Sequence, residues 1–296
     1  LQIQGLSAQE RAHILVNKGN AFLKQNKLQQ ARESYEAALN SFSSSAVAHF
    51  NLGRLFHLQN QLAEARREYV MAYSINPNLV QPHHNLGLVY ETRGEYSLAE
   101  REYRTALRID PTLVGSYVNL SNLLRQQGNT QEALKLLLEA RNISPNSPLI
   151  RDALAGLYFS QGEYGQARQE LEYPNPSIHA RQIQGLLAFR EGNFSEAATA
   201  LRQVYLQLGT AADQNFLINL GLALLKADEL ADAEKYIEQA AGMGRESVDL
   251  FNSLGSFYVL TSQLDKAKEA FTKSLQLSSQ QPQIQETLVA LEKVKD

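Results

Sequence analysis

Apolar side chains recur at helical spacing along most of the chain, as they do at Leu134, Leu137 and Leu138. A spacing of three to four residues gives a helix one apolar stripe and leaves its other faces polar. The apolar segments are separated by Asn or Gly, which tolerate the left-handed backbone that ends a helix. These turn residues are Asn26, Asn60, Gly94, Gly128, Gly162 and Gly192. The pattern predicts an all-α chain of short helices joined by tight turns.

The helical pattern repeats with a period of 34 residues. In the three clearest copies a glycine is followed by alanine after 12 residues, tyrosine after 16 and alanine after 19. The residues are Gly19, Ala31, Tyr35 and Ala38, then Gly53, Ala65, Tyr69 and Ala72, then Gly87, Ala99, Tyr103 and Ala106. Small residues at these positions let helices approach closely, and a larger one would cost about 1–3 kcal/mol by overpacking. Because one repeat cannot bury its apolar face alone, we expect the repeats to stack.

This pattern resembles the tetratricopeptide repeat family, whose helix A carries Leu-Gly and whose helix B carries Ala, an aromatic residue and Ala before a closing proline. Pro77, Pro111 and Pro145 are the closing prolines of repeats 2, 3 and 4. The resemblance covers residues 12–281 and implies a right-handed superhelical solenoid of antiparallel helix pairs. Eight repeats are expected, at 12–45, 46–79, 80–113, 114–147, 148–177, 178–213, 214–247 and 248–281.

The two ends of the array are expected to differ from the repeats. Residues 1–11 are predicted to form an N-terminal lead-in or a short cap. In residues 282–296, Ile284, Leu288 and Leu291 share one side of a predicted C-terminal capping helix. Such a helix would cover the apolar face of the last repeat, as a finite array requires.

The fifth repeat is irregular near residues 173–177, where Pro174 and Pro176 stop its second helix. One interpretation is a tolerated deletion inside a single solenoid, since surface connections absorb changes of length at small entropic cost. The other is a hinge between four regular repeats and four degenerate ones. The apolar stripe continues through the break, which favours one domain over residues 12–281.

The resemblance also implies that helix A lines the concave side of the solenoid, so that the position two residues before the small residue faces a groove. Asparagines occupy this position in five repeats, at Asn17, Asn51, Asn85, Asn119 and Asn219. The column is similar to the asparagine ladder in the superhelical arm of the O-linked N-acetylglucosamine transferases, which implies that it binds an extended polypeptide by its backbone. A carboxamide both donates and accepts hydrogen bonds and can pair with a peptide group. Alternatively, these amides bond to groups of their own helices.

Further groove contacts are expected from polar residues one turn along helix A. They are Asn20, Arg54, Asn122, Lys24, Gln126, Arg190 and Lys226. Repeats 5, 6 and 8 interrupt the asparagine column with Ala153, Ile183 and Ser253. These interruptions argue against continuous recognition by the asparagine column through the second half of the array.

Signatures of catalysis are missing from the sequence, which has no phosphate loop, dinucleotide fingerprint, zinc-protease motif or nucleophile elbow. It has no cysteine and hence no disulfide or thiolate metal site. His83 and His84 are adjacent on a helix and point about 100° apart, so that these two residues and His49 are expected to pack rather than to bind a metal. We expect no enzyme activity, no cofactor and no metal.

The charge and hydropathy narrow the choice of partners. A net charge of −3 with scattered Arg and Lys argues against nucleic acid, which needs a basic face. No apolar run approaches the roughly 18 residues of a membrane-spanning helix. The sequence does not decide where the protein resides. The alternatives are the cytoplasm and, where a signal or lipid anchor was removed, the periplasm.

The leading hypothesis is a non-enzymatic scaffold or adaptor that binds an extended segment or a helix of a partner protein in its groove. A second hypothesis is the regulatory or substrate-selecting arm of a larger enzyme. A third is an envelope factor that helps to assemble pili or secretion machinery, and a fourth is self-association.

Overall fold

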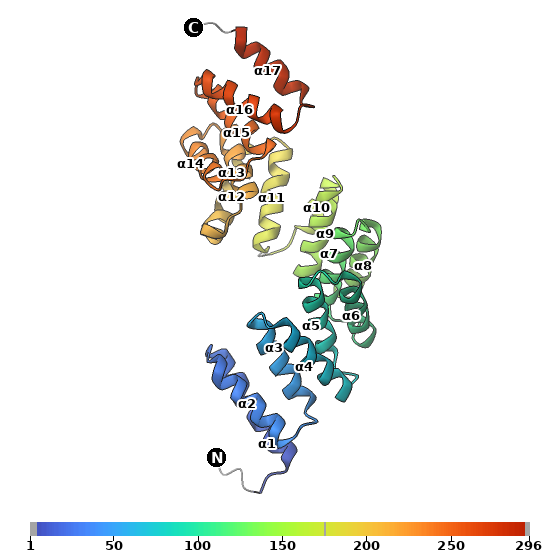
Figure 1. Cartoon of the computed structure of the whole chain (residues 1–296). Coiled ribbons are helices and arrows are strands. Elements are labelled where there is room, and N and C mark those ends of the chain that lie inside the picture. The colour runs from blue at the N-terminus through green and yellow to red at the C-terminus, as the bar shows by residue number, and fades with distance from the viewer. Residues whose placement is uncertain (1–4, 175, 294–296) are drawn as a thin grey trace. The chain divides into compact units, whose positions relative to one another are not determined.

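The computed structural model describes residues 5–174 and 176–293, and in this part of the chain all regular structure is helical (Figure 1). The helices that begin a repeat are α1 (Ala8–Lys24), α3 (Ala46–Leu58), α5 (Val80–Thr92), α7 (Val114–Gln126), α9 (Pro148–Ser160), α11 (Ile178–Arg190), α13 (Gln214–Lys226) and α15 (Val248–Leu260). Their partners are α2 (Leu28–Ser41), α4 (Leu62–Ile75), α6 (Tyr96–Ile109), α8 (Thr130–Ile143), α10 (Tyr164–Glu170), α12 (Phe194–Leu208), α14 (Leu230–Gly242) and α16 (Leu264–Leu277). A 3₁₀ turn (Gly209–Ala211) follows α12, and α17 (Pro282–Lys293) is the last helix described.

The fold is an all-α helical-repeat solenoid, as the sequence predicted. Contacts between Cα atoms divide it into two compact units, Leu1–Leu154 and Ala155–Asp296, which we call the N-terminal half and the C-terminal half. The division falls within α9, and each half is described by itself. The prediction of one continuous right-handed superhelix stays a prediction.

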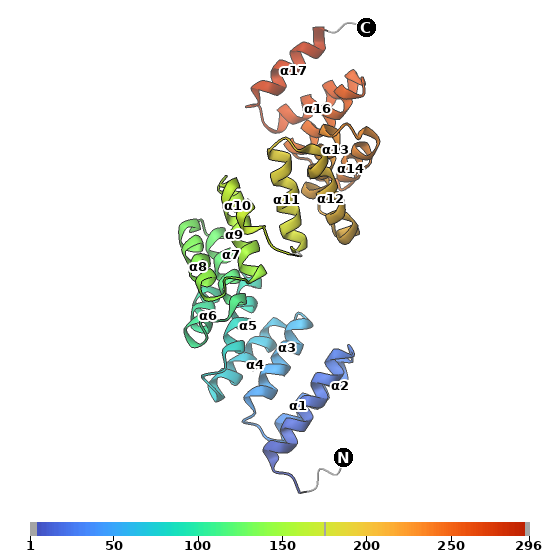
Figure 2. The same ribbon diagram turned by 180° about the vertical axis from the view of Figure 1, so that it is seen from behind.

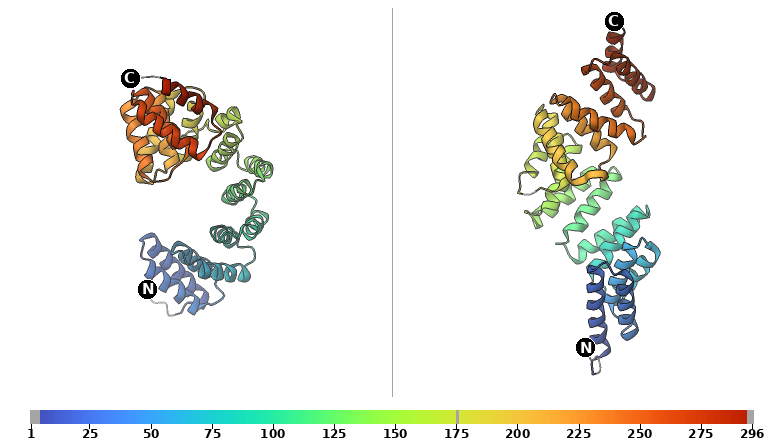
Figure 3. Two further views of the ribbon diagram at one scale, coloured as in Figure 1. Left: turned by 45° about the horizontal axis from the view of Figure 1, so that its top comes forward. Right: turned by 90° about the vertical axis from the view of Figure 1, so that its left-hand side faces the viewer.

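Within each half, helices A and B of a repeat lie side by side as antiparallel pairs, such as α1 with α2 and α13 with α14 (Figures 2 and 3). Helix A of one repeat also contacts helix A of the next, as in α1 with α3, α3 with α5, α5 with α7 and α13 with α15. In the N-terminal half these helices A therefore form one layer. In the C-terminal half α13 and α15 are in contact, and residues of α9, α11, α13 and α15 line one common hollow.

The turns between helices A and B are built as the sequence predicted. All six predicted turn residues have positive φ, from 57° at Asn26 to 83° at Gly128 and Gly192. Repeats 7 and 8 use Asp228 (φ 64°) and Ser262 (φ 58°) instead. Residues other than Gly and Asn rarely adopt this conformation, so the sequence did not reveal these two turns.

The close approach of helices A and B explains the period of the sequence. A Cβ atom added at Gly53 would lie 2.8 Å from ring carbons of Tyr69, and one added at Gly185 would lie 2.8 Å from Cγ of Leu201. The residue 16 positions later fills this space in the six repeats whose small residue is glycine, and Tyr35, Tyr69 and Tyr103 are 0% exposed. The predicted role of the small residues in helix packing is confirmed.

The ends of the array differ in detail from the prediction. Helix α1 begins at Ala8, four residues before the expected start of the first repeat, because Ser7 and Glu10 form a reciprocal capping box. At the other end, Leu291 packs against Ala267 and Phe271 of α16 together with Ile284 and Leu288. The last residues of the predicted capping helix, 294–296, lie outside the described part.

The fifth repeat has a short helix B. Helix α10 has seven residues, whereas α8 has 14. Leu171 is buried just after α10 ends, and α11 begins at Ile178 with Ser177 as its N-cap. The early stop agrees with the positions of the two prolines, which cannot continue a helix interior. Asn175, between them, lies outside the described residues.

Candidate partner-binding surfaces

The asparagines of the N-terminal half are partly engaged in local hydrogen bonds. Asn51 is only 5% exposed, and its Nδ2 donates to the carbonyl oxygen of Val47 at 2.9 Å. Its Oδ1 accepts from Arg54 at 3.4 Å, so that the two predicted contact residues bond to each other. At Asn51 the structure therefore favours the local alternative over a contact with a ligand.

Two further predicted groove residues form hydrogen bonds with buried tyrosines of helix B. The Tyr35 hydroxyl donates to Oδ1 of Asn20 at 2.8 Å, and Nδ2 of Asn85 donates to the Tyr69 hydroxyl at 3.4 Å. A buried hydroxyl without a partner is costly, so these amides stabilise the fold. Burial raises the pKa of Tyr35 and Tyr69, and both hydroxyls therefore stay protonated at physiological pH.

The remaining asparagines of this half are less enclosed. Asn17 and Asn122 are exposed. Asn119 is half-buried and lines a cavity of about 390 Å³, which we call the N-terminal cavity. Its other lining residues are Leu88, Glu91, Thr92, Tyr96 and Gln126. Glu91 accepts a hydrogen bond of 2.8 Å from the Tyr103 hydroxyl, and the aromatic side chain of Tyr96 is 45% exposed.

A larger hollow lies on the helices A of the C-terminal half, and we call it the C-terminal groove. It has a volume of about 590 Å³ and is lined by the end of α9 together with α11, α13 and α15. Its apolar residues are Phe159, Leu186, Phe189, Ile218 and Leu222. Its polar and charged residues are Arg190, Asn215, Asn219, Asp249, Asn252, Ser253 and Ser256. Four successive repeats thus contribute to one surface.

The apolar residues of the C-terminal groove are only partly covered by the fold. Ile218 is 2% exposed, but Phe159, Leu186, Phe189 and Leu222 are half-buried. Water in contact with such side chains is released when a partner covers them, which favours binding by roughly 25 cal/mol per Å² of apolar area. The groove therefore offers an apolar floor with polar edges, the usual composition of a protein-binding surface.

Two predicted residues belong to the C-terminal groove, Asn219 and Arg190. Asn219 follows the buried Ile218 on α13 and is half-buried. The sequence missed the five apolar residues because their helical spacing also suits core positions. A useful signal was that Phe159, Leu186, Phe189 and Leu222 lie one or four residues after the small residue. The first four repeats carry Asn20, Arg54, Asn122 and Arg125 among others at these positions.

A polar network supports one wall of the C-terminal groove. Nδ2 of Asn252 donates to Oε1 of Gln281 at 2.9 Å, and Nε2 of Gln281 donates to the carbonyl oxygens of Ser274 and Ser278 at 3.1 and 2.8 Å. These bonds join α15 to the end of α16 through Gln281, the residue that precedes α17. The connection between α16 and α17 therefore also supports the groove wall.

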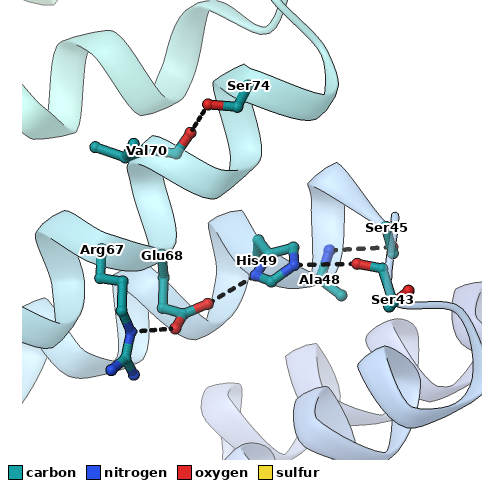
Figure 4. A network of polar contacts seen from close by, with 8 residues as sticks. All are labelled: Ser43, Ser45, Ala48, His49, Arg67, Glu68, Val70 and Ser74. Carbon is teal, nitrogen blue, oxygen red and sulfur yellow. Dashed lines mark hydrogen bonds and ion pairs between the residues drawn. The ribbon is translucent and has the colours of Figure 1, made fainter.

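The histidines of helices α3 and α5 serve packing. Nδ1 of His49 lies 2.7 Å from Oε2 of Glu68, and Arg67 donates to Oε1 of the same carboxylate at 3.2 Å (Figure 4). His83 and Glu102 repeat the pair at 2.8 Å, 34 residues later. Burial alone would raise the pKa of Glu68 and Glu102, but hydrogen bonds from the histidine and arginine outweigh it and lower both.

Neither a metal site nor a membrane span is evident in the part of the chain that the structure describes. Within residues 5–174 and 176–293, no three His, Cys, Asp or Glu side chains are grouped so that they could hold a metal ion. In the same residues, no helix is both long and apolar enough to cross a bilayer.

Comparisons with solved structures show the same fold. A structure of Pseudomonas aeruginosa pilF has a TM-score of 0.61 and 20% identity and covers 69% of this chain and 95% of its own. A chain of the APC/C hetero-tetramer Cut9–Hcn1 has a TM-score of 0.65 and 15% identity, and covers 98% of this chain but 57% of its own. At these identities the likeness concerns the fold alone. A comparison with curated protein sequences finds no match.

Family models cover most of the chain. Models described as tetratricopeptide repeat match residues 16–79, 80–113, 102–135, 183–244 and 218–282. A model described as YpiA-like, tetratricopeptide repeats, matches residues 126–173. The likeness to the asparagine ladder of the glycosyltransferases stays a prediction. The chain belongs to the tetratricopeptide repeat family.

Proposed function

We propose that this protein is a non-enzymatic interaction scaffold that holds a segment of a partner protein in the C-terminal groove. The observation that carries the proposal is the half-buried apolar floor of Phe159, Leu186, Phe189 and Leu222, spread over the first helices of three successive repeats. Tetratricopeptide repeat proteins generally bind other proteins and are generally non-catalytic.

The N-terminal half contributes less to partner binding in this proposal. Asn20, Asn51 and Asn85 already bond within the fold, so that a partner would have to replace those bonds. Asn119 also bonds within the fold, to Tyr103, but it lines the N-terminal cavity, which is open to a partner. We therefore place the main contact in repeats 5–8 and an auxiliary contact at Asn119.

The other functional hypotheses are also compatible with partner binding in the C-terminal groove. A regulatory arm of a larger enzyme and an envelope assembly factor would both act by binding a partner, and a fold-level likeness to pilF does not choose between them. Reading the complete gene separates the two by revealing either a catalytic domain or a signal with a lipid-attachment cysteine. Light scattering tests self-association.

Affinity capture from the lysate of the source organism tests the proposed surface. Leu222→Asp places a charge on the groove floor and is expected to abolish retention of the partner. Leu206→Asp is the matched control, because Leu206 lies on helix α12 and is 77% exposed. Circular dichroism checks the fold of both variants, and Ser256→Trp fills the groove without adding a charge. A partner retained equally by all four proteins would refute the proposed surface.

The triple variant of Asn51, Asn85 and Asn119 to Ala gives the comparison with the N-terminal half. The proposal expects reduced but measurable retention, since only Asn119 faces an open cavity. Complete loss in the triple variant, with full retention in Leu222→Asp, would move the main site to the asparagine column.

A further inference from the structure

The two charged side chains of the C-terminal groove lie at opposite ends of their helices. Arg190 is in the last turn of α11, and Asp249 is in the first turn of α15. Helices A run in the same direction in successive repeats, so that these residues belong to opposite edges of the groove. A partner in the groove meets a positive charge at one edge and a negative charge at the other.

In the part of the chain that the structure describes, Arg190 lacks the carboxylate partner that Arg202 and Arg168 have. Arg202 is paired with Glu229 and Asp232, and Arg168 is paired with Glu191. Among the described residues, neither Arg190 nor Asp249 forms an ion pair, although both line the groove. Both side chains are exposed, and the guanidinium of Arg190 has donors available for a ligand.

The apolar floor and Arg190 line the same groove. Leu186 lies one helical turn before Arg190 on α11, and Phe189 also lines the groove. A ligand that covers these side chains would exclude water around Arg190. An arginine–carboxylate contact is strengthened by such exclusion and by its two parallel hydrogen bonds.

We infer that the C-terminal groove selects a protein segment that combines large apolar side chains with an Asp or Glu side chain, the carboxylate meeting Arg190. This inference rests on the proposed function and names the chemistry of its partner. Asp249 lies at the edge opposite Arg190 and repels a carboxylate there, so that the bound segment is oriented with its carboxylate towards Arg190. A nucleic acid fits less well, since its row of phosphates would meet one arginine and an opposing carboxylate.

Synthetic peptides labelled with fluorescein test the inference by fluorescence anisotropy with the full chain. All carry an acetylated N-terminus and an amidated C-terminus, so that only side chains supply charge. The first peptide contains Leu, Phe and one Glu. In the second and third this Glu is replaced by Gln or Lys, and in the fourth the apolar residues are replaced by Ser.

The Glu peptide is expected to bind about tenfold more tightly than the Gln peptide, as a charge-assisted pair at a partly desolvated site allows. The Lys peptide is expected to bind more weakly still, and the Ser peptide not at all. Arg190→Glu should reverse the order of the Glu and Lys peptides, and Asp249→Asn should strengthen binding of the Glu peptide. Lys235→Glu is the matched control, because Lys235 lies on helix α14 outside the groove and the net charge change is the same.

The outcomes separate this inference from the proposed function. If the Glu, Gln and Lys peptides bind equally and Leu222→Asp abolishes all three, the groove binds apolar segments and the selection by Arg190 is wrong. If none of the apolar peptides binds the wild type, the inference is also overturned, and the lysate experiment then decides the proposed function alone. Reversal by Arg190→Glu but not by Lys235→Glu supports the inference.

Discussion

The two halves of the chain share one framework and differ in the side chain that covers the small residue of helix A. The N-terminal half uses Tyr35, Tyr69 and Tyr103, whereas the later repeats use Leu201, Ile237 and Phe271. Each tyrosine hydroxyl needs a hydrogen-bond partner, and Asn20, Asn85 and Glu91 on the layer of helices A provide one. The side chains of Leu201, Ile237 and Phe271 have no hydroxyl and need no hydrogen-bond partner.

The difference explains why the wider groove lies in the half with the less regular sequence. In the N-terminal half, polar groups on helix A are used to satisfy buried hydroxyls and are less available to a partner. In the C-terminal half, helix A can carry Leu186, Phe189 and Leu222 on its open side. A column of conspicuous residues at a fixed period can therefore serve the fold, while the binding surface lies elsewhere.

The largest expected effect is a packing difference between two glycines. A Cβ at either Gly53 or Gly185 would meet its neighbour at 2.8 Å, but Gly53 faces the broad ring of Tyr69 and the Ala65 carbonyl oxygen at 3.3 Å, whereas Gly185 faces the smaller side chain of Leu201. We expect Gly53→Ala to lower the free energy of unfolding by about 1–3 kcal/mol, because the ring and the carbonyl oxygen leave little room for the added atom. Gly185→Ala should cost clearly less. Urea unfolding followed by circular dichroism measures both.

A control for the glycine experiment is Gly165→Ala, because an added Cβ at Gly165 meets nothing within 4 Å. It should be neutral or stabilise the protein, since alanine is the better helix former by roughly 1 kcal/mol. Equal losses at Gly53 and Gly185 would show that the ring of tyrosine does not distinguish the halves.

A smaller effect is expected when a tyrosine hydroxyl is removed. Tyr35→Phe deletes the donor to Asn20, and we expect a loss of about 0.5–1.5 kcal/mol in the free energy of unfolding. The amide of Asn20 is then released to the open side of helix A. Thermal unfolding gives the stability change. An unchanged stability would mean that water replaces the hydroxyl and that the hydrogen bond from Tyr35 to Asn20 does not stabilise the fold.

Acid should destabilise the N-terminal half more than the C-terminal half. Burial lowers the pKa of His57 and His84, so that the unfolded chain takes up protons first and stability falls as the pH drops below the usual histidine range near 6.5. Glu68 and Glu102, whose pKa values are lowered, add a further loss as the pH falls below about 4.5 and approaches their folded values. Hydrogen exchange of each half, corrected for intrinsic rates, measures the histidine contribution between pH 7 and pH 5 and the added carboxylate contribution below pH 4.5.

A variant checks the source of this acid sensitivity. His84→Gln keeps a neutral side chain that can hydrogen-bond to Ser116, the partner of His84 at 2.9 Å. The variant should show a smaller fall in stability above pH 5 than the wild type. The same fall in both proteins would place the sensitivity at other groups.

The repeat frame, helix pairs and six turns could be predicted because they depend on local residue types at a fixed period. The turns at Asp228 and Ser262 could not, since those residues do not mark the left-handed conformation. The role of Asn51 depends on burial against its own helix, which the period does not reveal. The apolar residues of the C-terminal groove were missed because Phe159 and Phe189 have the spacing of core residues, and only packing shows that the fold leaves them half-covered.

The most direct test of the central claim uses the absence of cysteine from the chain. Ser256→Cys places a single thiol in the C-terminal groove, and Leu206→Cys places one on the exposed face of α12. Each thiol carries a photoreactive benzophenone, and crosslinks to partner protein in native lysate are compared. The account predicts crosslinks from position 256 that Leu222→Asp removes, and few from position 206. Equal crosslinking from both positions, unaffected by Leu222→Asp, would contradict it.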